Sequence, residues 1–357
     1  MTTYKEIRGT NIEAVASDPS NPVEGQVWYN TTTNVVKGLS FNSGTWATSG
    51  NLNTARRFPG GAGTQEAALG FGGGPPATAV TELYNGSNWT EVNDMVRGAS
   101  TYDIKGTGSS TAALAFGGGS APERAKTETW NGTNWTAVTA MSTPRGGGSF
   151  AGGTNTAAIA AGGAPAKANT ELYNGTNWTE VNNMNTARQG IGSAGYGSQT
   201  AGLAFGGSAP PPNSALTELW NGTNWTEVNN LNTSRQQLGG AGTSTAGLAI
   251  GGEGASGYTT ATESWNGTNW TSTTNMIGSA LYRMGTAGAN NTAALSFGGN
   301  PGAVVTTLEF NTGVVIGAWS TGGALNTGRN ELTGCGTQTA ALAIGGNPGL
   351  AITEAYN

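Results

Sequence analysis

The chain carries seven Gly-Gly pairs at a nearly constant interval of 44 to 47 residues, and each pair ends a short apolar run. A period of this size, with several β-type runs in every unit, is typical of propeller blades rather than helical repeats. Glycine makes up 61 of the 357 residues, a content that would indicate low complexity in a chain without a period. The period therefore predicts a folded, all-β protein. The pairs are Gly72-Gly73, Gly117-Gly118, Gly162-Gly163, Gly206-Gly207, Gly251-Gly252, Gly298-Gly299 and Gly345-Gly346.

Each repeat divides into four short strands. The best-kept repeat, residues 185–231, contains a glycine-rich stretch followed by apolar or β-prone runs at 200–205, 217–220 and 225–228. An Asn-Gly pair, Asn221-Gly222, separates the last two runs, and it predicts a tight hairpin because the turn needs positive φ. The sequence thus predicts four-stranded antiparallel blades.

A tryptophan follows the Asn-Gly turn in nearly every repeat. Neighbouring blades pack face to face, so we expect a large flat side chain on an outer strand to fill the wedge that opens away from the axis. These residues are interpreted as core rather than as a surface that stacks on a ligand. The seven tryptophans are Trp46, Trp89, Trp135, Trp178, Trp225, Trp270 and Trp319.

The two ends of the repeat array predict how the ring closes. Trp46 precedes the first full repeat, whereas the last repeat stops after its third run, at residues 353–357. We expect residues 44–48 to supply the missing strand by pairing beside 353–356, which leaves no open edge. The predicted fold is a seven-bladed β-propeller over residues 46–357, closed by the N-terminal strand joining the C-terminal blade, after a segment at residues 1–45.

Arginine and glutamate also recur with the repeats. Five repeats have an arginine near the start of their first strand, Arg283 is a displaced sixth, and six repeats have a glutamate two residues before the first aromatic. Only the Gly-Gly pair lies between the two positions, so the guanidinium of Arg188 is expected to cross the second strand and reach Glu218. The alternative is a ring of arginines that binds an anion.

Composition excludes many kinds of catalytic and metal site. The chain has no histidine, one cysteine (Cys335) and three aspartates. Serine-histidine and cysteine-histidine nucleophiles, and metals ligated by histidine, are therefore excluded. We interpret Cys335 as a buried, inert thiol, and we predict a protein that is not an enzyme and holds no metal or cofactor.

Charge and hydropathy indicate which partners to expect. Charged residues make up 10% of the chain and the formal net charge is −5, so no basic stripe can neutralise a run of phosphates. No apolar run approaches the roughly 18 residues of a membrane span, and the first residues lack the apolar core of a secretion signal. We expect neither nucleic acid binding nor membrane insertion.

The repeats resemble the kelch repeats of β-propellers. The resemblance is carried by an apolar run that closes on Gly-Gly, as at 203–207, and by a spaced aromatic pair such as Trp220 and Trp225. It extends over roughly residues 46–357, and it depends on seven coincident repeats. Copper oxidases of the kelch type need histidine ligands, which this chain lacks. A glycoside hydrolase needs two non-repeating acids in one pocket, and no such pair is evident.

The N-terminal segment is similar to a different group of proteins. Residues 18–30, with the following 31–46, resemble a segment frequent in tail-fibre and other virion structural proteins of bacteriophages. The resemblance implies a short β-hairpin that docks on other virion proteins, and Trp28 and Tyr29 are the expected docking residues. The alternative is a cap packed on the chain's own propeller. Residues 1–17 are expected to order only against another subunit.

The most variable positions fall in the loops between the second and third strands, which the fold places on one face. Per-repeat variation on one rim is where propellers usually bind. Tyr258 and Glu253 in one loop, and Pro210, Pro211 and Pro212 in another, are the predicted adhesive patch. With the phage resemblance, they indicate a non-enzymatic tail-fibre or appendage protein that binds a host-surface glycan or outer-membrane protein.

Other functions and assemblies stay open at this point. A purely structural protein that decorates or bridges capsid, neck or tail is the first alternative, and a carbohydrate-active enzyme is the second. The phage resemblance implies assembly in the host cytoplasm and release within the virion, and a homo-oligomer is compatible with it.

Overall fold

A computed structural model of the chain describes residues 13–17, 27–32, 35–38, 44–74, 78–98, 102–147, 149–209, 213–312, 333–337, 340–344 and 353–356. The chain divides into two compact units. One comprises Asn42–Gly313, and the other comprises Met1–Phe41 with Val314–Asn357.

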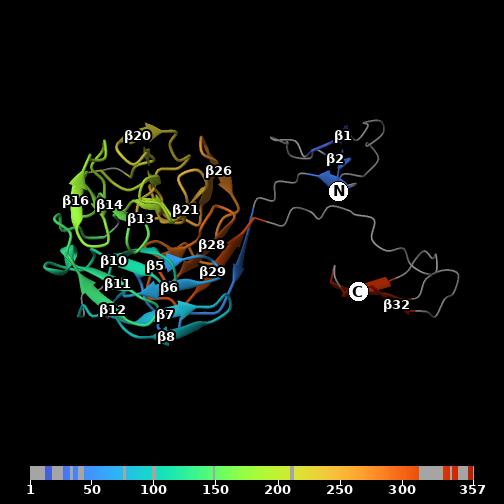
Figure 1. The fold of residues 1–357 in the computed structure, drawn as a ribbon, viewed down its shortest axis with the longest axis horizontal. Helices are drawn as coiled ribbons and strands as arrows, with labels where there is room; N and C mark the ends of the chain where they lie inside the picture. Colours follow the sequence, from blue (N-terminus) through green and yellow to red (C-terminus); the bar gives the residue numbers. More distant parts are fainter. Residues whose placement is uncertain are drawn as a thin grey trace. The chain divides into compact units, whose positions relative to one another are not determined.

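The larger unit is a β-propeller of six four-stranded antiparallel sheets, which are numbered as blades 1 to 6 and arranged in a circle (Figure 1). Blade 1 contains β5 (Gly60–Gly63), β6 (Ala68–Phe71), β7 (Thr81–Tyr84) and β8 (Trp89–Val92). Blade 2 contains β9 (Lys105–Gly108), β10 (Ala113–Phe116), β11 (Thr127–Trp130) and β12 (Trp135–Val138). Blade 3 contains β13 (Phe150–Gly153), β14 (Ala158–Ala161), β15 (Thr170–Tyr173) and β16 (Trp178–Val181).

The other three blades repeat this order of strands. Blade 4 contains β17 (Gly192–Ala194), β18 (Gly202–Phe205), β19 (Thr217–Trp220) and β20 (Trp225–Val228). Blade 5 contains β21 (Gly239–Gly242), β22 (Gly247–Ile250), β25 (Thr262–Trp265) and β26 (Trp270–Thr273). Blade 6 contains β27 (Gly285–Ala287), β28 (Ala293–Phe297), β29 (Thr307–Asn311) and β4 (Thr45–Thr48). Loops carry the 3₁₀ helix η1 (Glu123–Ala125) and the hairpin β23 (Glu253–Gly254) with β24 (Gly257–Tyr258).

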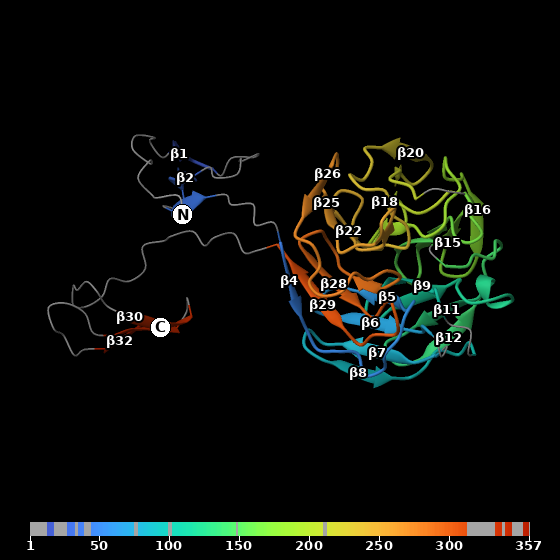
Figure 2. The ribbon, with the colours of Figure 1, turned by 180° about the vertical axis from the view of Figure 1, so that it is seen from behind.

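The inner strands of the blades surround the axis. They contact one another in the cyclic order β5, β9, β13, β17, β21, β27 and again β5. The view from behind shows the same circular arrangement of the blades (Figure 2). Small residues make this approach possible. A Cβ on Gly61 would lie 2.5 Å from the Thr286 carbonyl oxygen of blade 6, and one on Gly106 would lie 2.8 Å from the Gly61 carbonyl oxygen. Side chains at these positions would force the blades apart.

The prediction of seven blades is wrong, and so is the predicted pairing of residues 44–48 with 353–356. β4 pairs antiparallel with β29, which places Trp46 opposite Phe310. The last repeat instead forms a separate three-stranded sheet of β30 (Thr333–Thr337), β31 (Ala340–Ile344) and β32 (Thr353–Tyr356) in the other unit. In this pairing Trp46 packs against Phe310, with ring centroids 5.2 Å apart, and donates a hydrogen bond to the Thr274 carbonyl oxygen of blade 5. The N-terminal strand therefore completes the sixth sheet.

The tryptophans of the outer strands join neighbouring blades. Trp135 Nε1 donates a hydrogen bond to Thr81 Oγ1 at 2.9 Å, and its ring meets the edge of Phe71 at 5.0 Å, so blade 2 is fixed to blade 1. Trp46 Nε1 donates instead to the Thr274 carbonyl oxygen. All six described tryptophans are buried; Trp319 lies outside the described residues. The same bond to a threonine hydroxyl is made by Trp89, Trp178, Trp225 and Trp270.

Five blades contain a buried arginine–glutamate pair. In blade 4, Arg188 Nη2 donates to Glu218 Oε1 at 2.7 Å, and Nη1 donates to the carbonyl oxygens of Gly206 and Leu216. The guanidinium thus passes the Gly-Gly pair, as the sequence led us to expect. Each arginine lies within its own blade, which makes an anion-binding ring of arginines wrong for these residues. The other pairs are Arg56–Glu82, Arg97–Glu128, Arg145–Glu171 and Arg235–Glu263.

Blade 6 replaces this ion pair with an apolar contact. Leu308 occupies the position of the glutamate, and Leu281 occupies the position of the arginine. The Leu281 carbonyl oxygen accepts a hydrogen bond from Gly252 N–H, just as the Arg235 carbonyl oxygen accepts one from Gly207 N–H. Both leucines are buried in one cluster. Arg283 is therefore not a displaced member of the arginine set; it forms an ion pair with Asp103.

The smaller unit also contains a sheet near the start of the chain. β1 (Glu13–Val15) pairs parallel with β2 (Val27–Asn30), and β2 pairs antiparallel with β3 (Val35–Gly38). Trp28 and Tyr29 lie in β2, and the Tyr29 side chain is half-buried.

Candidate functional site

The variable loops and the segments that precede the inner strands lie at the same end of the blades. Gly60, at the start of β5, pairs with Phe71, at the end of β6. The connection from β6 to β7 therefore lies beside the segment that enters β5. Gly192 and Phe205 have the same register in blade 4. This end of the propeller, formed by the connections from second to third strands and by the segments before the inner strands, is termed the loop face.

A ring of backbone hydrogen bonds surrounds the axis at the loop face. In blades 1, 2, 5 and 6, the backbone N–H two residues before the inner strand donates to the carbonyl oxygen of the equivalent residue in the preceding blade, with N–O distances from 2.7 to 3.0 Å. The bonds run from Asp103 to Phe58, from Phe58 to Arg283, from Arg283 to Gln237 and from Gln237 to Gly190. These five residues are termed the mouth ring. The equivalent position of blade 3 lies outside the described residues.

The mouth ring holds an unusual backbone conformation. Its members have φ between 51° and 66°, and its four non-glycine residues are all of the non-glycine residues with positive φ in the described part of the chain. Such conformations cost on the order of 1–3 kcal/mol each and collect at functional sites. The ring therefore marks the loop face as the end of the propeller where function is expected.

The side chains of the mouth ring differ from blade to blade. Arg283 Nη1 donates to Asp103 Oδ2 at 3.1 Å, and its guanidinium lies 4.7 Å from the centre of the Phe58 ring. Across the axis, Gly190 has no side chain. A pocket lies at the mouth, and all five members of the mouth ring line it. Because the blades differ at these equivalent positions, the mouth is asymmetric.

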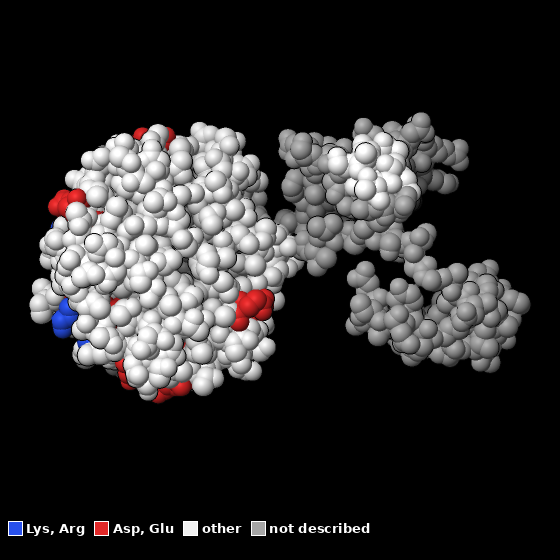
Figure 3. Space-filling view, in the orientation of Figure 1, with Lys and Arg blue, Asp and Glu red and all other residues white. Residues whose placement is uncertain are grey.

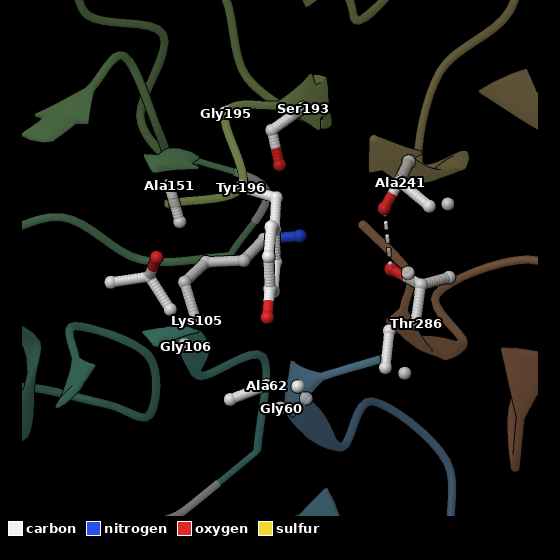
Figure 4. A pocket seen from close by; sticks show the side chains of 18 of the residues that line it. Gly60, Ala62, Lys105, Gly106, Ala151, Ser193, Gly195, Tyr196, Ala241 and Thr286 are labelled. Carbon is white, nitrogen blue, oxygen red and sulfur yellow. Dashed lines mark hydrogen bonds between the residues drawn. The ribbon is translucent and has the colours of Figure 1, made fainter. Parts of the chain in front are cut away.

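The pocket continues along the axis as a channel, which is lined by the inner strand of every blade. Glycine and alanine form most of its wall, and the side chains of Lys105, Ser193, Tyr196 and Thr286 project into it (Figure 4). Thr286 Oγ1 donates to the Gly240 carbonyl oxygen at 2.7 Å. The channel can therefore offer a positive charge and hydroxyl groups to a small ligand.

Electrostatics inside the channel are dominated by three groups. Burial lowers the pKa of Lys105, the Asp103 carboxylate opposes this shift, and Arg283 adds to it. Burial raises the pKa of Asp103, although Arg283 and Lys105 both act to lower it. Since Asp103 is engaged by Arg283, the positive charge of Lys105 has no partner of its own among the described residues.

Further from the axis, an aromatic pair is exposed at the loop face. Tyr258, in β24, stacks on Tyr282 with ring centroids 4.3 Å apart and an interplanar angle of 15°. Tyr258 is 46% exposed, and its hydrogen bond to Tyr282 raises the pKa of the Tyr258 hydroxyl. Tyr282 also accepts a hydrogen bond from the Asn300 amide. The predicted residue Tyr258 is thus brought beside residues of blade 6.

Glu253 lies in the same loop as Tyr258, but it faces the neighbouring blade. Its carboxylate accepts a hydrogen bond from Gln236 Nε2 at 3.1 Å, and its carbonyl oxygen accepts one from Asn213 Nδ2 at 2.9 Å. Glu253 therefore fixes the loop of blade 5 against that of blade 4. Pro210, Pro211 and Pro212 lie outside the described residues.

The mouth ring and Lys105 are the site residues that sequence reasoning missed. One signal was present: among the first residues of the inner strands, Lys105 stands where the other blades have glycine or phenylalanine. The mouth ring gave no signal, because Phe58, Asp103, Gln237 and Arg283 share no residue type.

Within the described residues, no group of three acidic, histidine or cysteine side chains is placed to hold a metal ion, and no helix is long and apolar enough to cross a membrane. A comparison with protein-family models gives no match, and a comparison with curated proteins gives no significant match. The resemblances to kelch repeats and to phage virion segments therefore depend on the motifs of the chain alone.

Proposed function

We propose that this protein is a non-enzymatic adhesion protein whose propeller binds a ligand at the loop face. The observation that carries the proposal is the exposed Tyr258–Tyr282 stack. Most large aromatic side chains elsewhere in the described propeller are buried as core, and Tyr258 is the only aromatic residue among its exposed large hydrophobics. Tyrosine is enriched at binding hot spots because it combines a flat apolar ring with a polar hydroxyl.

The surroundings of the stack suit a binding role. The other exposed large hydrophobics, Val96 and Ile277, also lie in segments that lead from an outer strand to the next inner strand, and so at the loop face. In the view of Figure 3, charged side chains form only a few separate patches toward the edge of the propeller. A surface with exposed rings, amides and little charge fits a neutral glycan or a protein loop better than nucleic acid.

The proposed setting is a bacteriophage virion. The resemblance of residues 18–46 to virion segments supports a tail fibre or appendage, in which the N-terminal segment docks on other virion proteins through Trp28 and Tyr29. The propeller would then meet a glycan or an outer-membrane protein of the host surface. The virion would be assembled in the host cytoplasm and released with this protein attached.

Binding of labelled protein to host cells tests adhesion. We expect Tyr258→Ala to reduce binding about tenfold or more, as is typical when an aromatic hot spot is removed. Thr223→Ala is the matched control, since Thr223 is exposed on the turn between β19 and β20 at the opposite end of the blade. Equal binding by wild type and Tyr258→Ala would contradict a role for the stack.

The second candidate function is decoration or bridging of capsid, neck or tail, and the similarity of the N-terminal segment favours it as much as adhesion. In that case Tyr258→Ala does not change binding to host cells, whereas deletion of residues 1–30 removes the protein from particles. Immunogold electron microscopy of purified virions separates the two: label on tail tip or fibres supports adhesion, and label on head or neck supports decoration. Absence from particles would contradict both.

A further inference from the structure

The axial channel contains a cation that the fold does not explain. The five buried arginines of the described propeller pair with the glutamates of their blades, and the partly exposed Arg283 pairs with Asp103. Lys105 instead projects into the channel and forms no hydrogen bond or ion pair with a described residue (Figure 4). An ammonium group withdrawn from water without a partner is costly, so a partner from outside the chain would stabilise it.

The position of Lys105 is unusual for its place in the fold. It is the first residue of β9, where β5, β17, β21 and β27 begin with glycine and β13 begins with phenylalanine. Glycine at this position in blades 1, 4 and 6 leaves room for the phenylalanine ring of the second strand, whereas lysine brings a long charged side chain there. The packing of the inner strands does not require this residue.

Two hydroxyl groups reach the same channel from blade 4. Ser193 lies in β17, and Tyr196 follows that strand. Figure 4 shows both side chains directed into the channel with Lys105. Neither hydroxyl forms a hydrogen bond with another described residue. One ammonium and two hydroxyl donors therefore line a single space, which is the donor set that an oxyanion needs.

The charge of the channel favours an anion. The charged groups that face Lys105 are Asp103, which precedes it on the same segment, and Arg283 from blade 6. Asp103 and Arg283 neutralise each other at 3.1 Å, so the channel keeps the single positive charge of Lys105. A bound anion would also oppose the lowering of the Lys105 pKa by burial.

We propose that the axial channel binds a small oxyanion, a carboxylate or a phosphate group, between the Lys105 ammonium and the hydroxyls of Ser193 and Tyr196. The ligand enters from the loop face through the mouth ring. This site is separate from the Tyr258–Tyr282 stack, and it does not depend on the proposed adhesion.

Isothermal titration calorimetry of the full chain tests the site, with sodium phosphate and sodium acetate titrated separately at low ionic strength and pH 7. We expect saturable binding of one ion per chain for at least one of them. Binding of phosphate alone indicates a phosphate-bearing ligand, and binding of acetate alone indicates a carboxylate. Absence of saturable binding by both ions would overturn the proposal.

Three variants assign the binding to the channel. Lys105→Met should weaken binding about tenfold or more, because a charged hydrogen-bond partner is lost. Lys105→Arg should retain it, and Lys167→Met, which removes the same charge outside the channel, should bind as wild type does. Circular dichroism confirms that each variant is folded. Equal binding by Lys105→Met and wild type, or equal losses in Lys105→Met and Lys167→Met, would show that the channel is not the site.

Discussion

Arg188 and Leu281 occupy equivalent positions in blades 4 and 6, but Arg188 pairs with a carboxylate whereas Leu281 packs against an apolar side chain. Arg188 is buried against Glu218, and its Nη1 group also satisfies two backbone carbonyls. Leu281 is buried in an apolar cluster with Leu308. A buried ion pair gains little over a well-packed apolar pair, but either charge left alone is strongly destabilising. The two residues of each pair are therefore expected to change together.

Arg188→Leu tests this coupling. The substitution leaves the Glu218 carboxylate buried without its cation, so we expect the free energy of unfolding to fall by about 3–5 kcal/mol. Urea denaturation followed by tryptophan fluorescence measures it. The double variant Arg188→Leu with Glu218→Leu reproduces the apolar pair of blade 6 and should recover a large part of the loss. A double variant as unstable as Arg188→Leu would refute the coupling.

At the scale of the element, the outer strand of blade 6 comes from a part of the chain far from its neighbours. β4 precedes blade 1, whereas its partner β29 follows β28 at the end of the propeller. The connection between the two chain ends of the ring is thus made by backbone hydrogen bonds and by Trp46, which is buried between Phe310 and the Thr274 carbonyl oxygen. Strand β4 therefore joins blade 6 to blade 1, because the chain continues from β4 into β5.

Trp46→Ala should open this connection. Emptying a buried tryptophan site costs about 3–5 kcal/mol, and the lost hydrogen bond adds to the loss. Thr48→Ala is the control on the same strand, because Thr48 is exposed and its replacement should change stability by no more than about 0.5 kcal/mol. Thermal and urea unfolding measure both variants. An unchanged midpoint for Trp46→Ala would mean that β4 does not hold the ring.

At the scale of the whole molecule, the sequence predicted each blade but not their number. The Gly-Gly, Asn-Gly and tryptophan positions depend on contacts within one repeat or between adjacent repeats, so the period reveals them. The partner of β4 depends instead on a competition between the third strands of the last two repeats, which carry Phe310 and Tyr356 at equivalent places. No local pattern decides it. The sequence did not reveal the mouth ring either, because its positive φ values accompany hydrogen bonds between blades rather than one residue type.

The six-bladed ring predicts how deletions at the two ends of the chain change the stability of the propeller. Because β27 contacts β5 and β4 completes blade 6, the propeller has every strand that it needs within residues 44–312. Deletion of residues 313–357 should therefore leave the free energy of unfolding of the propeller unchanged to within about 0.5 kcal/mol, the usual range for changes outside the core. Deletion of residues 1–48 removes β4 and should destabilise blade 6 by at least the cost of Trp46→Ala. A ring of seven blades would behave differently, since loss of the last repeat would then open it, so a collapse of the C-terminal deletion variant would refute the six-bladed closure.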